Sequence, residues 1–298
     1  MSKTQVKSND RFSKFRMESP LGKFFTILLY VVMTIIVLIV LLPVLHIIAA
    51  SFSDPQAMIS GKVSFWPKDF TLRGYEAVFT YKKFWTGFRN SLFYMVFGTF
   101  INIVMTLLCA YPLSRKEFTA RNKVAMFFVF TMYFSGGMVP SFMLVNALGL
   151  VDTIWAMLIP GAMSTYNMII ARTYMINSIP DELYEAAEID GCSPMRTFLT
   201  IVLPLSKAAL AAIGLMFSVT YWNDYTNFKI YVTNNKLFNF QMKLRSMVMD
   251  SDLPTDDTIS TNALQNAAVI VAIIPFMILY PFCQDYFVQG INVGAVKE

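Results

Sequence analysis

The sequence predicts an all-α, polytopic membrane protein with six transmembrane helices. Of its 298 residues, 56% are hydrophobic and only 14% are charged, and the mean hydropathy is +0.52. A soluble domain carries about 25% charged residues, so this chain has too much apolar surface for one water-soluble core. The charged residues leave six uncharged runs, at residues 24–53, 90–114, 124–151, 153–171, 208–223 and 258–284. Four of these runs exceed the roughly 20 residues that a membrane helix needs.

The remaining two runs also fit a membrane helix. The run at 153–171 is close to the required length, and the run at 208–223 is extended by Lys207 and Asp224, whose side chains can reach water from its ends. The first run is far longer than the roughly 7–15 residues of a signal-peptide core, so we expect a retained helix. The expected organisation is a basic tail (1–23), a six-helix membrane domain (24–290) and a C-terminal tail (291–298).

The distribution of basic residues predicts the orientation. An even number of helices puts both termini on one side, and the first 23 residues hold six basic and two acidic residues. Positive-inside bias places both termini in the cytoplasm and the tail against anionic lipid. The outer segments at about 52–89 and 224–260 contain basic residues too, together with acidic ones. The net charge of +5 follows from this topology, so we expect no nucleic-acid partner.

The sequence offers no catalytic or metal-binding constellation. Cys109, Cys192 and Cys283 are far apart and form no CxxC pair, so we expect free thiols and no metal site. The single histidine, His46, is expected to be packed or interfacial, with a proton relay as the less favoured alternative. No G-x-x-x-x-G-K-[ST] motif occurs, so the chain cannot use ATP by the P-loop route and we expect it to bind no cofactor.

Helix-breaking residues interrupt several of the apolar runs. Gly136, Gly137 and Pro140 lie in the third run, Pro160-Gly161 in the fourth, and two prolines in the sixth. Broken backbone at membrane depth occurs where it is buried in protein or lines a cavity. Ordinary kinks in packed helices are the alternative. We interpret Gly136, Gly137 and Pro140 as a hinge in a bundle that moves around a pathway.

The polar stretch at 178–207 predicts a helix-turn-helix on the cytoplasmic face. Pro180 suits the start of a helix, and Gly191 suits the left-handed position that ends it. Ser193 then caps a second helix that opens with Pro194, and Pro204 marks the boundary to the fifth membrane helix.

The first of these short helices has a small-residue face. Leu183, Ala186, Ala187 and Asp190 follow helical spacing, and Glu185 and Glu188 flank them. An isolated helix this short is unstable in water, so we expect it to dock against a partner. A generic amphipathic loop is the alternative.

This loop resembles the EAA signature of permease subunits of bacterial ABC importers. The matching positions are Glu185, Ala186, Ala187, Gly191, Ile201, Leu203 and Pro204. Residues 134–140, the stretch from Leu148 to Thr153, and Trp222-Asn223 resemble the di- and oligosaccharide branch, which includes the maltose permease, and within it the LplC/YtcP-type permeases. The likeness covers residues 20–298.

The resemblance implies a type I importer permease in the bacterial cell membrane. The implied partners are a second, non-identical permease, a cytoplasmic ABC ATPase dimer that holds ATP and Mg²⁺, an extracellular solute-binding protein and membrane lipid. The ATPase would dock on the loop residues named above. The implied function is import of a carbohydrate, an oligosaccharide, by alternating access. The chain itself would not be an enzyme.

Side chains that suit a sugar pathway carry aromatic rings or hydrogen-bonding groups. The candidates are Tyr133, Asn167, Tyr221, Trp222, Asn223 and Tyr225. Each has a plainer alternative, an interfacial anchor or an interhelical hydrogen bond. Three other functions remain open: a permease for peptides or another solute, an ion-driven secondary transporter, and an intramembrane hydrolase. The last two lack the buried charges or the nucleophile–base pair that they need.

Overall fold

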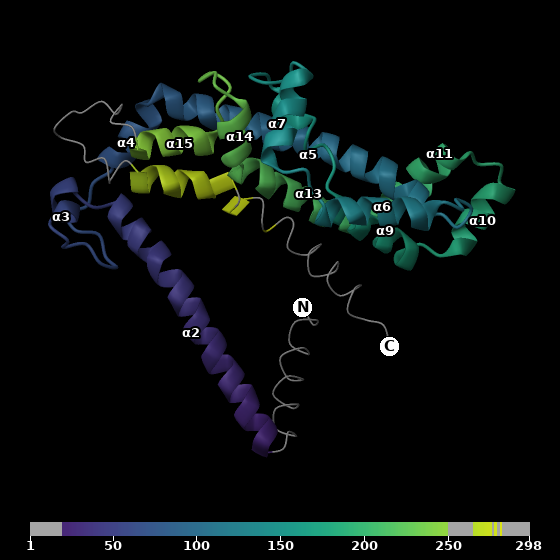
Figure 1. Cartoon of the computed structure of the whole chain (residues 1–298). Helices are drawn as coiled ribbons and strands as arrows, with labels where there is room; N and C mark the ends of the chain where they lie inside the picture. Colours follow the sequence, from purple (N-terminus) through teal and green to yellow (C-terminus); the bar gives the residue numbers. More distant parts are fainter. Residues whose placement is uncertain (1–19, 250–264, 276, 279–280, 282–298) are drawn as a thin grey trace. The chain divides into compact units, whose positions relative to one another are not determined.

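The described part of the chain is entirely helical (Figure 1). The computed structural model describes residues 20–249, 265–275, 277, 278 and 281, and the all-α prediction is confirmed there. Residues 1–19 of the predicted tail 1–23, the predicted tail 291–298, and residues 250–260 of the second predicted outer segment lie outside the described residues. The chain forms two compact units, residues 1–75 with 256–270, and residues 76–255 with 271–298.

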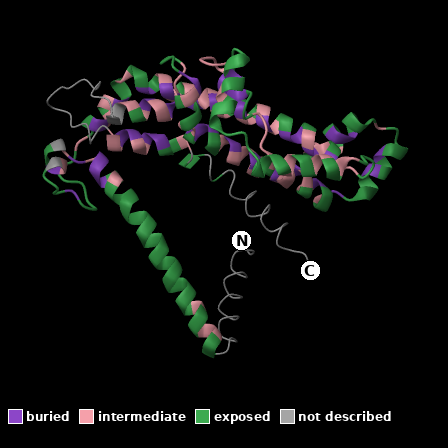
Figure 2. Ribbon diagram, viewed as in Figure 1, coloured by how far each residue is buried: buried purple, intermediate pink, exposed green. Residues whose placement is uncertain are grey.

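The first unit contains the longest exposed apolar helix. Helix α2 (Pro20–Ser51) has 32 residues, of which only Ala49, Ala50 and Ser51 are buried (Figure 2). At 1.5 Å per residue it is about 48 Å long, more than the roughly 30 Å of bilayer hydrocarbon. A helix that is apolar all round suits lipid or a neighbouring membrane helix.

The chain after α2 folds back along its outer end, through the short helix α3 (Pro55–Ile59). The Nδ1 atom of His46 lies 2.8 Å from the Ser64 carbonyl oxygen, so Nδ1 is the donor. The Lys68 backbone N–H donates to Ser53 Oγ at 3.0 Å. His46 therefore has a structural partner, as the interfacial interpretation predicts.

Three helices form the core of the second unit. Helices α5 (Lys82–Ser114), α9 (Thr165–Ser178) and α13 (Lys207–Asn223) pack on one another (Figure 1). The buried residues of α5 recur every three or four positions, from Phe84 to Leu113, which defines one continuous face. Met168, Ile213 and Phe217 from the other two helices pack into the same apolar cluster.

Two of the apolar runs are broken helices and not continuous ones. The third run forms α6 (Arg121–Tyr133) and α7 (Met138–Ala147), which meet at 112° around Gly136 and Gly137. The fourth forms the short α8 (Trp155–Leu158), breaks at Pro160-Gly161 and continues as α9. Of the two alternatives, the structure therefore has breaks and not ordinary kinks.

The remaining helices lie toward the two ends of α5. Helix α15 (Phe240–Met249) packs on α5, and α14 (Thr226–Tyr231) packs on α8. The short helix α4 (Arg73–Thr80) precedes α5 in the chain. At the opposite end of α5 lie α10 (Asp181–Ile189) and α11 (Pro194–Thr197) (Figure 1). A π-helical turn, η1 (Phe198–Val202), and α12 (Leu203–Leu205) lead from α11 into α13.

Two helices are long and apolar enough to cross a membrane, α2 and α5. Each of two bent pairs, α6 with α7 and Pro194–Leu205 with α13, also qualifies as one crossing, which gives up to four. A shorter apolar helix runs from Gln265 to Pro275. These numbers refer to the described residues only.

Helices α5 and α13 pack closely at Gly98. A Cβ atom added there would lie 2.3 Å from Cζ of Tyr221. We expect Gly98→Ala to lower the free energy of unfolding by about 1–3 kcal/mol, because the buried ring has to move. The control is Gly161→Ala, where an added Cβ meets no atom within 4 Å. Thermal unfolding of the two purified variants measures this, and equal unfolding temperatures would contradict the close packing.

Candidate functional site

Helix α10 is the first part of the candidate site, and its ends form as the sequence predicts. It begins at Asp181, one residue after Pro180, and Gly191 adopts φ +70° just beyond its end. Ser193 Oγ accepts a hydrogen bond from the Arg196 backbone N–H at 3.4 Å and so caps α11. The predicted helix-turn-helix is therefore present at the end of α5.

The face that α10 turns outward differs from the prediction. Tyr184 and Ala187 are 6% and 3% exposed, because they pack inward against the chain's own helices. Ala187 is thus not available to a partner on the same face as Leu183, Ala186 and Asp190, which are exposed. The four residues were grouped by helical spacing, but spacing alone does not tell an inward face from an outward one.

Ile189 is the residue that the sequence analysis missed. It is 87% exposed, the highest exposure of any large apolar side chain among the described residues. It stands between Glu188 and Asp190, and Glu185 lies one helical turn before it, so an apolar side chain projects from an acidic surface. The available signal was an isoleucine between two acidic residues on a short polar helix. The core of the chain does not need an apolar side chain at that position.

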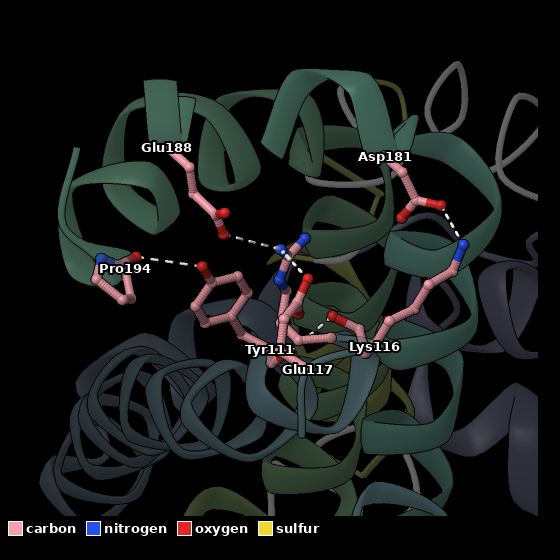
Figure 3. A network of polar contacts seen from close by, with 8 residues as sticks. Tyr111, Lys116, Glu117, Asp181, Glu188 and Pro194 are labelled. Atoms are coloured by element: carbon pink, nitrogen blue, oxygen red, sulfur yellow. Dashed lines mark hydrogen bonds and ion pairs between the residues drawn. The ribbon is translucent and has the colours of Figure 1, made fainter. Parts of the chain in front are cut away.

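Arg115, just after the end of α5, anchors α10. Its guanidinium carbon lies 3.5 Å from the centre of the Tyr184 ring. The same guanidinium lies 2.9 Å from Glu117 Oε1 and 3.9 Å from Glu188 Oε1. Figure 3 labels Glu117 and Glu188 and marks these two ion pairs with dashed lines. Glu188, predicted to meet a partner's basic groups, thus has a basic neighbour within the chain, whereas Glu185 is exposed with no such pairing among the described residues.

Two further contacts attach the starts of α10 and α11 to the end of α5 and to the residues just after it. The Lys116 ammonium donates a hydrogen bond to Asp181 at the start of α10, and this holds the pKa of the Asp181 carboxyl below its ordinary value. Tyr111, in the last turn of α5, donates its hydroxyl to the Pro194 carbonyl at 3.2 Å (Figure 3). Both short helices are therefore attached to the end of α5.

The later signature residues lie at the junction with α13. Ile201 and Leu203 are half-buried, and between them Val202 is fully buried in the core of the second unit. Pro204 is exposed, and the chain bends by 79° before α13. These residues connect the helix-turn-helix to the core, and they do not extend the outward face of α10.

A cavity within the second unit is the other part of the candidate site. Its volume is about 440 Å³. Amide and hydroxyl groups dominate its polar lining, and no Lys, Arg or His lies among the residues that the structure places around it. The lining consists of Asn102, Ser141, Ala156, Met157, Pro160, Gly161, Met163, Ser164, Asn167, Phe217, Thr220, Tyr221, Asp224, Asn227 and Tyr231.

The cavity includes two of the six predicted pathway residues, Asn167 and Tyr221. Trp222 is buried elsewhere, with its ring 5.6 Å from that of Phe88. Tyr133 is 79% exposed on α6, and Asn223 donates its side-chain amide to the Val219 carbonyl at 3.0 Å. Neighbouring side chains at the end of α13 point in different directions, which residue type and spacing alone do not reveal.

Asn102 is a cavity residue that the sequence analysis missed. It is buried in α5, and its Oδ1 accepts a hydrogen bond from the Tyr221 hydroxyl at 3.1 Å. A buried amide costs free energy unless it is hydrogen-bonded, so this contact links α5 to α13 at the cavity wall. Asn102 stands in the middle of an apolar run, and that placement was the available signal.

The anchoring role of Arg115 is testable by hydrogen exchange. We expect Arg115→Gln to speed amide exchange in α10 by roughly fivefold, because the cation–π contact and the ion pairs together contribute about 1 kcal/mol. Lys123→Gln is the control, since Lys123 is an exposed cation on α6. Unchanged protection in α10 would show that Arg115 does not hold it.

Comparisons with known proteins agree with this geometry. Residues 84–293 match the family described as binding-protein-dependent transport system inner membrane component. The chain is 36% identical to the polygalacturonan/rhamnogalacturonan transport system permease protein YtcP of Bacillus subtilis, over 93% of this chain and 99% of that protein. It is also 36% identical to protein LplC of the same organism, over 87% and 90% of the two chains.

A solved structure is similar over nearly the same extent. A chain of a bacterial ABC transporter involved in the import of the acidic polysaccharide alginate superposes with a TM-score of 0.85 at 30% identity, covering 91% of this chain and 99% of that one. The chain therefore belongs to the family of binding-protein-dependent transport system inner membrane components, the multi-pass permease subunits of ABC importers.

Proposed function

We propose that this chain is one of two non-identical permeases in an importer that moves an oligosaccharide into the cell by alternating access. The observation that carries the proposal is α10, which exposes Ile189 outward while Arg115 holds its inner face to α5. An ATPase that seats on α10 would thereby pull on a membrane-crossing helix. In this arrangement ATP and Mg²⁺ belong to the cytoplasmic ATPase dimer, and a solute-binding protein delivers the sugar from outside.

The proposed topology has six crossings with both termini in the cytoplasm, in the manner of a type I importer permease. The four crossings available in the described residues support it, together with the apolar helix from Gln265 to Pro275. Helices α10 and α11 then lie on the cytoplasmic side, and α14 and α15 lie outside.

Two observations support a carbohydrate as the transported solute. The cavity presents amide and hydroxyl groups beside the aromatic side chains of Phe217, Tyr221 and Tyr231, which suits the hydroxyl groups and apolar faces of sugar rings. The relatives named for polygalacturonan/rhamnogalacturonan and for alginate both handle polysaccharides. No observation in the described chain favours peptides over sugars.

The docking proposal is tested at Ile189. We expect Ile189→Asp to reduce recovery of the ATPase with the purified permease by about tenfold or more, because a buried charge replaces an apolar contact of about 2 kcal/mol. Ile189→Val keeps an apolar side chain and serves as the matched control. Membrane insertion should survive in both variants. Normal ATPase recovery and normal uptake with Ile189→Asp would rule out this docking surface.

The cavity is tested at Tyr221. We expect Tyr221→Phe to lower oligosaccharide uptake several-fold, since the buried Asn102 amide loses its hydrogen-bond donor, while ATPase recovery stays normal. Stimulation of ATP hydrolysis by a panel of oligosaccharides and a panel of peptides, each with the solute-binding protein, identifies the solute class. A response to peptides alone would replace the carbohydrate assignment by the peptide one.

A further inference from the structure

A group of cations surrounds Tyr225, between the end of α13 and the helices α14 and α15. The Arg245 guanidinium carbon lies 4.6 Å from the centre of the Tyr225 ring. The Lys229 ammonium lies 5.8 Å from the same point. The three side chains come from the start of α14, its interior and α15, so the fold brings them together. Tyr225 is half-buried, whereas Lys229 and Arg245 are exposed.

These cations lack carboxylate partners within the described residues. The ion pairs found there join Arg115 and Lys116 to Glu117, Glu188 and Asp181, all at the opposite end of α5. A third cation of this region, Lys243, lies on α15. It is buried and donates a hydrogen bond to the side-chain amide oxygen of Asn235 at 2.8 Å. Among the described residues of this region, the positive charge is balanced by aromatic rings and amides and not by acidic side chains.

Asp224 directly precedes Tyr225 in the chain, and its carboxylate accepts hydrogen bonds from Asn227. One oxygen accepts from the Asn227 backbone N–H at 3.1 Å, and the other accepts from the Asn227 side-chain amide at 3.0 Å. Asp224 thus caps α14 and does not pair with Lys229 or Arg245. Within the described ranges, Lys229 and Arg245 are therefore exposed cations that no acidic side chain pairs with.

The cation group lies beside the cavity. Asp224 and Asn227, which line the cavity, precede and follow Tyr225 in the chain. A guanidinium binds a carboxylate through two parallel hydrogen bonds, and amides and hydroxyls of the cavity suit the neutral hydroxyl groups of a sugar. An acidic sugar is the ligand that matches both halves of this surface.

We propose that Tyr225, Lys229 and Arg245 form a subsite for the carboxylate of a uronic-acid unit, next to the sugar-lined cavity. The inference rests on the proposed carbohydrate import and narrows it to acidic oligosaccharides. Arg245 and Lys229 bind the carboxylate, and Tyr225 holds both cations in position. The site discriminates by charge, so a neutral sugar of the same size and ring structure binds more weakly.

The test compares a galacturonate trimer with its methyl ester, which has the same rings without the charge. Binding is measured by calorimetry on the complete transporter in nanodiscs of phosphatidylcholine, which offer no anionic headgroup. We expect the acid to bind about fivefold tighter than the ester, and Arg245→Gln or Lys229→Gln to reduce that preference to near unity. Arg245→Lys should keep most of the preference because it keeps the charge.

Lys236→Gln is the control. Lys236 is an exposed cation of the same region, but the cations over the Tyr225 ring are Lys229 and Arg245. Equal binding of acid and ester, no binding of the acid, or an unchanged preference in Arg245→Gln and Lys229→Gln would each overturn the subsite. Loss of acid binding on adding phosphatidylglycerol at trace amounts would assign the cations to lipid and overturn it too. Uptake of neutral but not acidic oligosaccharides would contradict the subsite and leave the proposed carbohydrate import standing. Uptake of peptides alone would contradict both the subsite and carbohydrate import.

Discussion

Buried residues recur along the 33 residues of α5, mostly every three or four positions, and form one face. The elements that pack on this face are therefore held in fixed positions relative to one another. Near its start, the Asn90 side-chain amide donates to the carbonyls of Lys236 and Phe238 in the loop before α15. In its middle, Gly98 and Asn102 contact Tyr221 at the cavity wall. At its end, Tyr111 and the adjoining Arg115 hold α10 and α11. One helix thus connects the loop before α15, the cavity and the proposed ATPase surface.

The exposed surfaces of the chain fit a subunit that functions inside an assembly. Helix α6 has no buried residue, and most of α2 is exposed although both are strongly apolar. Leaving that area in water would be costly at about 25 cal/mol per Å², so it suits lipid or other protein surfaces. The polar groups, in contrast, lie where the chain satisfies them itself, as at Asn102 and Arg115.

Much of the fold follows from local chemistry that a sequence displays. Glycine at Gly191 and serine at Ser193 define where α10 ends and α11 begins, because few other residues satisfy those backbone positions. The direction of each side chain does not follow in the same way. Ala187 and Ile189 both fit an amphipathic helix, and only the packing of Tyr184 against Arg115 decides which face turns inward. Similarly, Trp222 and Tyr221 are adjacent, yet one packs among phenylalanines and the other lines the cavity.

The contact between Gly98 and Tyr221 has a mechanical consequence. Where a helix backbone rests directly on an aromatic ring, the two helices cannot slide past each other without separating. Helices α5 and α13 are therefore expected to move together. The chain bends sharply between α6 and α7 and again at Ser206, before α13. A displacement of α10 would then be carried along these two packed helices to the loops at the other end of α5.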